Sequence, residues 1–488
     1  MAWTNSALRR IRFGYNPGDH KPNVWRGDGN VVVCMPPRGG KETTIIAPIG
    51  FTYPGSLISS CPRFQAASIF AGHRYCNMKQ ECFIIEPFEE FTEWAIGLPY
   101  VGFNPMQGLD PDDLAFIEKC DRLAGALIVS HGGGDDNSAH FREAALSAVS
   151  GVIGGVVLLF PEKDRNLVTV YDVVSNPARC SVFVEECLAT KSDFLISRLS
   201  YLASDAARSG ANREVDSIYS TIRTQLRFLS GGACRKCLSD SRSIRLRDFK
   251  TGNPASLFYT VKLGYEDTAE KTSRLLFSTL LNEMEAPHPD PVPVLALWDE
   301  YRNTLARFSL ATASLSYSAG MGFTQLCAWQ DTPQMVAATS PSSWQTLLGT
   351  CAVKVFGRPS ENFTSDWLSQ ALGETEVIVT SKNVGYDAAT RWDRADNVRI
   401  NVSVDRRQAT RRLMASQEIR QMPDSEMIIL SDDLPFPARV DRVPYYKAPE
   451  FDGLYGPDPT YPPSFNVKGP RPRWAHGKTF LFGSGRRG

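Results

Sequence analysis

Short runs of apolar, often β-branched residues recur near both ends of the chain, and segments long enough to form a helix separate them. Strands that alternate with helices in this way are typical of a parallel sheet whose two faces are both covered. The pattern therefore predicts an α/β fold with a parallel central sheet. The predicted strands are residues 31–34, 56–60, 82–85, 256–261, 292–298, 323–328 and 352–356.

The middle of the chain has a different pattern. Between residues 112 and 247 apolar positions recur at spacings of three and four with hardly any strand signal, which indicates amphipathic helices. The longest apolar stretch, residues 144–160, holds two serines and three glycines and stops at Pro161. It is shorter than the ~20 apolar residues of a membrane span, so we expect a buried helix there.

At 488 residues the chain is longer than one hydrophobic core usually supports. We predict a turn-rich N-terminal segment (1–30), a nucleotide-binding α/β domain (31–111 and 248–455), an inserted all-α domain (112–247) and a basic, Pro/Gly-rich tail (456–488). Within the second half, short strands are expected at 377–380, 398–404 and 427–430. A helix is expected at 414–422, with Ser416 as its N-cap.

A glycine-rich turn follows the first predicted strand and precedes a predicted helix. A phosphate-binding loop reads G-x-x-x-x-G-K-[ST], in which backbone amides wrap phosphates and the hydroxyl holds magnesium. Gly40 and Lys41 fit the end of this motif, but Met35 stands at the first glycine and Glu42 at the hydroxyl. An acid beside phosphates repels them unless it points away or reaches the metal. The candidate nucleotide-binding residues are Arg38, Gly39, Gly40, Lys41, Glu42 and Thr43; a glycine turn before a surface lysine is the alternative.

Polar residues follow two later strands. Asp299 and Glu300 come directly after the apolar run 294–298, and Gln330 follows 323–329. Ligands of parallel α/β sheets bind at the carboxyl ends of the strands. We expect Asp299, with Thr43, to hold Mg²⁺, Glu300 to act as the general base, and Gln330 to sense phosphate or orient water. A strand that simply meets solvent is the alternative for Asp299 and Glu300.

Overall charge is uninformative, because 53 basic and 53 acidic residues balance. DNA contact would need local clusters, and these occur at residues 9–12, 406–407, 411–412 and in the tail; solvated faces are the other interpretation. No apolar run follows the first twelve residues, and eleven cysteines without a secretory signal suggest a reducing cytosol. Cys234 and Cys237 form a lone CxxC, which we interpret as ordinary thiols rather than a zinc or redox site. His73, His131 and His140 lack partners at metal-binding spacing.

These motifs, in this order, resemble the TraG-like coupling proteins of type IV secretion, which belong to the FtsK/HerA branch of P-loop ATPases. Residues 37–41 resemble the family loop P-T-R-S-G-K, residues 297–301 its Leu-Leu-Asp-Glu-Phe strand end, and residues 329–331 its Leu-Gln-Asp. Residues 84–88 with 103–105, 355–357, 372–375, 413–423 and 445–451 follow the rest of the family pattern, so the resemblance spans about 30 to 455. Where the family has hydrophobic-Asp-Pro-Lys-Gly-Glu, this chain has Cys61, Pro62, Arg63, Phe64 and Gln65, and Glu86 replaces an aspartate.

The resemblance implies a RecA-like domain with an inserted all-α domain, ATP and Mg²⁺ as cofactors, and a hexameric ring. It implies delivery of relaxase-bound DNA or effector proteins to a type IV secretion channel from the cytoplasmic side of the inner membrane. A neighbouring subunit would supply an arginine, for which Arg307 and Arg358 are candidates by position. The family's N-terminal transmembrane helices are not expected in this sequence, so a separate membrane-anchored partner is one possibility. A substrate adaptor without useful hydrolysis is the alternative function, because of Met35, Glu42 and the acid lost at Cys61.

Overall fold

The computed structural model describes residues 8–91, 97–129, 136–203, 212–239, 243–261, 264–339, 343–387 and 399–460. The predicted loop around His131 and nearly all of the basic tail lie outside these ranges.

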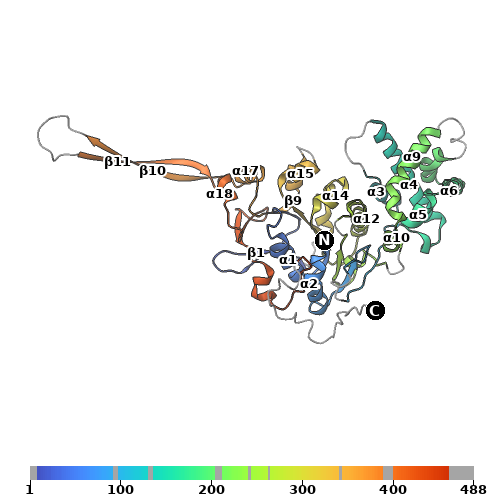
Figure 1. Ribbon diagram of the computed structural model, residues 1–488, viewed down its shortest axis with the longest axis horizontal. Coiled ribbons are helices and arrows are strands. Elements are labelled where there is room, and N and C mark those ends of the chain that lie inside the picture. The colour runs from blue at the N-terminus through green and yellow to red at the C-terminus, as the bar shows by residue number, and fades with distance from the viewer. Residues whose placement is uncertain are drawn as a thin grey trace, which may run out of the picture.

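One large mixed sheet forms the centre of the molecule (Figure 1). All seven strands predicted as parallel are present, in the order β9-β3-β8-β7-β4-β6-β5, and every neighbouring pair among them is parallel. On the β9 side, β12, β13, β1 and β2 continue the sheet with antiparallel pairing. The turn-rich N-terminal segment thus contributes two strands that its polar pattern did not indicate. The strands are β1 Ile11–Tyr15, β2 Pro22–Trp25, β3 Asn30–Cys34, β4 Ser56–Ser60, β5 Glu81–Ile85, β6 Ala255–Tyr259, β7 Val294–Trp298, β8 Phe323–Trp329, β9 Cys351–Phe356, β12 Glu426–Ser431 and β13 Ala438–Asp441.

The central strands are apolar on both faces because a separate core lies on each side of the sheet. Along β3, Val32 and Cys34 belong to one hydrophobic cluster, whereas Val31 and Val33 belong to the other. Successive side chains of a strand point to opposite faces, so an uninterrupted apolar run is what a doubly covered strand requires. Covering helices include α1 Ala47–Thr52 and α2 Gln65–Cys76 on one side, and α12 Glu266–Glu285 on the other.

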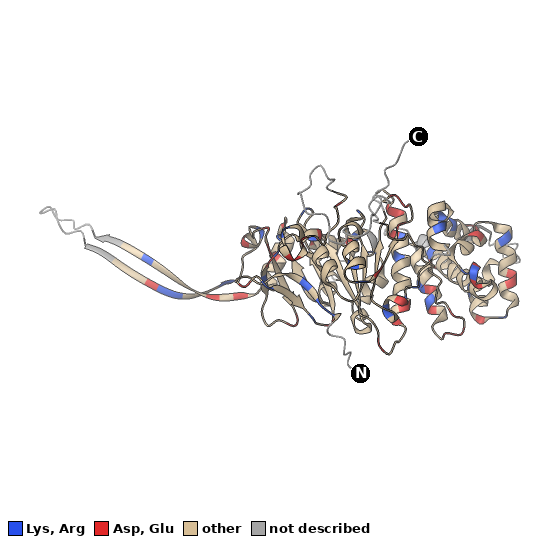
Figure 2. Ribbon diagram, turned by 90° about the horizontal axis from the view of Figure 1, so that it is seen from below, with Lys and Arg blue, Asp and Glu red and all other residues tan. Residues whose placement is uncertain are grey.

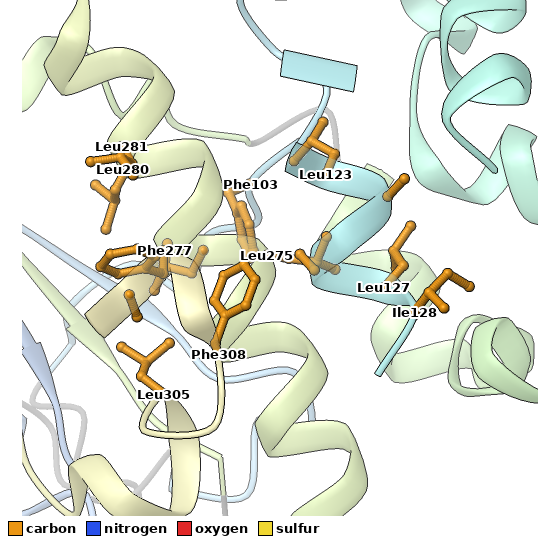
Figure 3. Packing of buried hydrophobic residues seen from close by; sticks show 14 of the residues in the cluster. Phe103, Leu123, Leu127, Ile128, Leu275, Phe277, Leu280, Leu281, Leu305 and Phe308 are labelled. Carbon is orange, nitrogen blue, oxygen red and sulfur yellow. The ribbon is translucent and has the colours of Figure 1, made fainter. Parts of the chain in front are cut away.

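The described residues 97–115 after β5 form turns and irregular chain, and the helices that follow them before β6 gather at one end of the molecule, at the right of Figure 1. α3, which carries Leu123 and Leu127, packs beside α12, whose Phe277 packs against Phe308 (Figure 3). The helices are α3 Phe116–Leu127, α4 Asp136–Leu159, α5 Leu167–Val174, α6 Pro177–Ala189, α7 Asp193–Leu199, α9 Asn212–Leu226, α10 Gly232–Ser239 and α11 Asp248–Thr251.

The long apolar stretch predicted as a buried helix lies in α4. Its segment His140–Leu159 is long and apolar enough to cross a membrane by length and composition alone, but 61% of the most apolar window is buried inside the protein. Val149, Val152 and Val156 belong to the same core as α12. The helix therefore serves as the core of the surrounding helices.

A long two-stranded hairpin projects from the body at the end opposite the helices, as Figures 1 and 2 show. Its strands are β10 Glu374–Asp387 and β11 Arg399–Arg412, paired antiparallel over fourteen residues each. The prediction of two short strands here was wrong in extent. The described side chains of both faces are largely exposed, including Ile378 and Val402, so no apolar alternation marks where the strands begin and end.

The predicted helix 414–422 is shorter, α18 Ser416–Arg420, and Ser416 is its first residue rather than its N-cap. Ala415 is the N-cap, and its amide donates to the Glu418 carboxylate (2.7 Å). The Ser416 hydroxyl instead donates to Ser365 (2.9 Å) on α17 Asn362–Ala371. The Ser416 side chain therefore joins α18 to α17, and Glu418 caps the start of the helix.

Arg74 fixes the turn between α1 and β4 from inside the core. Its fully buried guanidinium donates to the carbonyls of Gly50 (2.8 Å), Tyr53 (2.9 Å) and Gly55 (3.0 Å). We predict that Arg74→Met lowers the free energy of unfolding by about 3–5 kcal/mol, because these carbonyls lose a buried charged donor. Urea unfolding measures this, with the exposed Arg179→Met on α6 as the control; equal stability of the two variants would contradict it.

Candidate nucleotide site

The carboxyl ends of four adjacent parallel strands meet at one edge of the sheet. Cys34 pairs with Trp329, Trp298 with Cys327, and Ser60 with Trp298. The residues that follow these strand ends, among them the glycine turn, Asp299 and Gln330, are therefore neighbours in space. Phe277 of α12 packs on Trp298 (5.9 Å between ring centroids) and so supports the strand that ends at Asp299.

The glycine turn folds back on itself between β3 and the first covering helix. The Gly39 amide donates to the Pro36 carbonyl (2.9 Å), and Gly40 has a left-handed backbone (φ +79°), which glycine adopts without steric cost. Arg38 is also left-handed (φ +60°), an uncommon conformation for a residue with a Cβ. Lys41 then caps a π-helical turn, Glu42–Ile46, that runs into α1. A strained loop that opens a helix is a frequent feature of binding sites.

Lys41 reaches across the edge to the acids after β7. Its Nζ lies 2.6 Å from Asp299 Oδ1 and 3.5 Å from Glu300 Oε1, and these side chains are mostly buried. Burial by itself would lower the pKa of Lys41, but the carboxylates of Asp299 and Glu300 outweigh it and raise the pKa. The Lys41 ammonium therefore stays charged, in a position from which it could bind an anion in place of the two carboxylates.

Glu300 and Gln330 form a second contact at the same edge. Gln330 Nε2 donates to Glu300 Oε2 (3.0 Å), and Gln334 Nε2 of α15 Thr332–Ala338 donates to Gln330 Oε1 (2.8 Å). The backbone of Glu300 is left-handed (φ +53°), which turns its carboxylate away from the line of β7. A carboxylate held by an amide in this way is suited to accept a proton from a water molecule that the amide also orients.

Glu42 does not point away from the edge. Both of its carboxylate oxygens are buried and have no hydrogen-bond partner among the described residues. A donor atom of Glu42, one of Cys61 and one of Asp299 all lie within 4.8 Å of one another. Burial and the charge of Asp299 raise the pKa of Glu42 well above its usual range. Two carboxyls at this separation, one without a partner, fit a divalent cation.

Thr43, expected beside Asp299, is used differently. Its hydroxyl donates to the Gly40 carbonyl (3.2 Å), as does that of Thr44 (2.8 Å), in the first turn of the helix. Glu42 is the residue of this turn whose carboxyl lies beside Asp299.

Two departures from the family pattern meet in space at this point. Cys61 occupies the strand end where the family has aspartate, and Glu42 brings a carboxyl to the same place from the loop. The exposed Arg63 stands where the family has lysine. Its positive charge acts to lower the pKa of Glu42, but burial and Asp299 outweigh it. The site therefore keeps two carboxyls, although one comes from a different element.

The two candidate trans arginines are placed differently. Arg307 is exposed in the turn after α13 Tyr301–Thr304. Arg358 follows β9 and pairs with Asp424 (3.2 Å). It lines a pocket beside the glycine turn of its own chain.

Sequence reasoning did not find Arg442, which follows β13 and braces the loop. Its guanidinium donates to the Gly39 carbonyl and lies 3.4 Å from Met35 Sδ, and the residue is 6% exposed. The contact shows how the loop accommodates Met35 at a glycine position. No motif marks Arg442, since it lies about four hundred residues from the loop and is brought there by the antiparallel extension of the sheet.

The fold and this edge define an α/β protein with a RecA-like, P-loop NTPase architecture. The chain belongs to the family of type IV secretory system conjugative DNA transfer proteins, whose model matches residues 8–466.

Three solved structures illustrate the likeness. The bacterial conjugative coupling protein TrwBdeltaN70, in its unbound monoclinic form, is 14% identical over 89% of this chain and 90% of that chain, with a TM-score of 0.61. TrwB in complex with ADP and Mg²⁺ is 13% identical over 90% and 92%, with a TM-score of 0.60. VirB4 of Thermoanaerobacter pseudethanolicus is 10% identical over 90% and 97%, with a TM-score of 0.51. At these identities the likeness establishes the fold. The comparison with curated proteins returned no match.

The buried Glu42 carboxyl leads to a prediction about stability. A carboxyl whose pKa is raised on folding binds its proton more tightly in the folded protein, so its stability contribution is lost as pH rises from the unfolded pKa, about 4.3, toward the folded value. We expect Glu42→Gln to stabilise the nucleotide-free protein by at least about 1 kcal/mol at pH 8 and by little near pH 4. Thermal unfolding across pH tests this, with the exposed Glu81→Gln as the control. A gain that does not grow with pH would contradict it.

Proposed function

We propose that this chain is a coupling ATPase that delivers relaxase-bound DNA or effector proteins to a type IV secretion channel. Membership of the conjugative DNA transfer family supports the coupling role. The observation that carries the ATPase is the cluster in which Lys41 meets both Asp299 and Glu300, while Gln330 holds Glu300.

The geometry suggests how these residues would act on ATP. Lys41 would exchange its contact with the acids for the terminal phosphates, and the glycine turn would line the rest of the triphosphate. Glu300, released from Lys41, would accept the proton of the attacking water, which Gln330 helps to orient.

Asp299 and Glu42 are the residues that would hold Mg²⁺. The fit rests on the partnerless Glu42 oxygens beside Asp299, and TrwB, which has been solved with ADP and Mg²⁺, supports the same pair of cofactors here. When bound, Mg²⁺ neutralises phosphate charge.

A ring, most simply a hexamer, would complete the site with an arginine from the neighbouring subunit, and Arg307 and Arg358 stay candidates for this role. We retain the division into a nucleotide-binding domain (31–111 and 248–455) and an inserted all-α domain (112–247). Action at the inner membrane through a separate membrane-anchored partner is part of the same proposal.

The basic clusters differ in their availability to DNA. Arg9 and Arg12 are paired with Asp28 and Glu450 inside the chain. Arg406 and Arg407 lie on the exposed hairpin β10–β11, where Arg407 pairs only with its exposed neighbour Asp405 (3.3 Å) among the described residues. The hairpin is therefore the better candidate for phosphate contact, which should weaken steeply with salt.

A substrate adaptor on the same fold is the second candidate, and Glu42 is the observation that favours it, because its carboxyl is buried without a partner beside the loop and would repel phosphates when ionised. ATP turnover measured across protein concentration, with and without DNA, separates the two. The motor predicts turnover per subunit that rises with concentration and with DNA; turnover equal to that of Lys41→Ala under all conditions would favour the adaptor.

A further inference from the structure

A buried thiol lies beside the two carboxyls at the edge of the sheet and takes no part in the proposed reaction. Cys61, directly after β4, is 2% exposed. The Asp299 amide donates to the Ser60 carbonyl (3.1 Å), which joins the ends of β4 and β7. The Cys61 amide donates to the Tyr259 carbonyl (3.1 Å), and its own carbonyl accepts from Thr260 Oγ1 (2.8 Å). The sheet therefore fixes the thiol next to Asp299.

Glu42 completes a set of three side chains that can bind a metal. One donor atom each from Glu42, Cys61 and Asp299 lies within 4.8 Å of the other two. Around one tetrahedral ion, ligand atoms with bond lengths of about 2.0–2.3 Å are roughly 3.3–3.7 Å apart, so side-chain movements of about 1 Å bring all three onto one ion. Within the ranges that the structure describes, no other three histidine, cysteine or acidic side chains come this close.

Hydrogen bonding and charge at this point favour a cation. Both Glu42 oxygens are buried, and no described residue donates to either of them. The carboxylates of Glu42, Asp299 and Glu300 meet one ammonium, that of Lys41, so two negative charges are uncompensated when all three acids are ionised. A divalent cation would balance them. Two further side chains whose charges reach Glu42 are opposite in sign, Asp458 and Arg63.

The thiol distinguishes this set from a magnesium site. Mg²⁺ takes oxygen ligands, whereas thiolate sulfur prefers Zn²⁺ and related ions. A metal removes the proton from a thiol that coordinates it, so binding would release the Cys61 proton to solvent and leave one thiolate and two carboxylates around the ion. Three protein ligands with an open fourth position are typical of zinc sites that also hold a water molecule.

We propose that Glu42, Cys61 and Asp299 form a site for a thiophilic divalent cation such as Zn²⁺, which binds in the absence of nucleotide. The site goes beyond the proposed function, since it does not depend on ATP. It shares Glu42 and Asp299 with the Mg²⁺ of that function, so the two ions exclude each other and Zn²⁺ competes with Mg-ATP.

The test uses the full chain without nucleotide and Co²⁺ as the probe, because Co²⁺ replaces Zn²⁺ at such sites and a thiolate bound to it absorbs in the near ultraviolet. We expect about one Co²⁺ per chain, with a sulfur-to-cobalt band that Zn²⁺ abolishes and millimolar Mg²⁺ does not. Cys61→Ser should lose the band and weaken Zn²⁺ binding at least about tenfold, since even contacts outside the ligand shell contribute on that scale. Glu42→Gln should weaken Zn²⁺ binding similarly.

Cys61→Asp restores the acid of the family pattern and gives a second variant in case serine disturbs the fold. It should lose the band and bind Mn²⁺ at least as tightly as wild-type protein does, because an all-oxygen set suits that ion. Unfolding midpoints verify that the variants are folded.

Other cysteines provide the controls. Cys234→Ser/Cys237→Ser removes the CxxC pair of α10, and Cys76→Ser removes the least buried of the eleven cysteines; both variants should keep the band. No band in wild-type protein, or a band that Cys61→Ser keeps, would overturn the proposal. A band lost only without Cys234 and Cys237 would place the ion at that pair and would overturn it as well.

These outcomes are separate from those of the proposed function, because every measurement is made without nucleotide. Protein that lacks the cobalt band and binds Mg-ATP would lose the thiophilic site alone. Protein that shows the band and does not bind Mg-ATP would lose the ATPase alone.

Discussion

Replacing Glu300 with glutamine should lower ATP turnover by about two to four orders of magnitude and leave ATP binding nearly unchanged. Glutamine keeps the shape and the contact with Gln330, which lies 3.0 Å from the carboxylate, but it cannot take a proton from water. Steady-state turnover of the assembled protein, together with calorimetric binding, separates the two effects.

Asp290→Asn is the matched control for this variant, because Asp290 is an exposed acid in the loop before β7. It should turn over ATP at the wild-type rate. If Glu300→Gln retained more than about a tenth of wild-type turnover, Glu300 would not be the general base.

Replacing Lys41 with methionine should abolish measurable ATP binding and also destabilise the protein. Lys41 is mostly buried between Asp299 and Glu300, and removing one partner of a buried ion pair costs about 3–5 kcal/mol, because the remaining charges lose their counterion. Calorimetry reports the binding, and urea unfolding reports the stability.

A double variant separates these two consequences. Lys41→Met/Asp299→Asn removes both ends of the 2.6 Å ion pair, so we expect it to recover most of the lost stability without recovering ATP binding. Recovery of binding along with stability would show that Lys41 acts through the fold and not on phosphate.

The seven parallel strands and the edge where their polar ends meet could be predicted from the sequence for one physical reason. Strands covered on both faces are continuous apolar runs, and the first polar residues after such runs, Asp299 and Gln330, fall at the same edge. Burial on both faces therefore produces continuous apolar runs that can be recognised in a single sequence.

Other features leave no such signal. The strands of the hairpin β10–β11 are exposed on both faces, so their length depends on pairing that apolar periodicity does not reveal. The meeting of Glu42 with Cys61 and the bracing of Gly39 by Arg442 join residues that are distant in the sequence. Each depends on the order of strands in the sheet, which local patterns do not determine.

Calorimetric titration of Mg-ATP into wild-type protein tests most directly whether this altered loop is a nucleotide site. The loop has Met35 in place of a glycine, yet it presents Lys41, and Glu42 stands with Asp299 where a cation would bind. We predict saturable binding that requires Mg²⁺ and disappears in Lys41→Met/Asp299→Asn, whose fold should be intact. The absence of binding at millimolar Mg-ATP, or binding that this variant retains, would contradict the account.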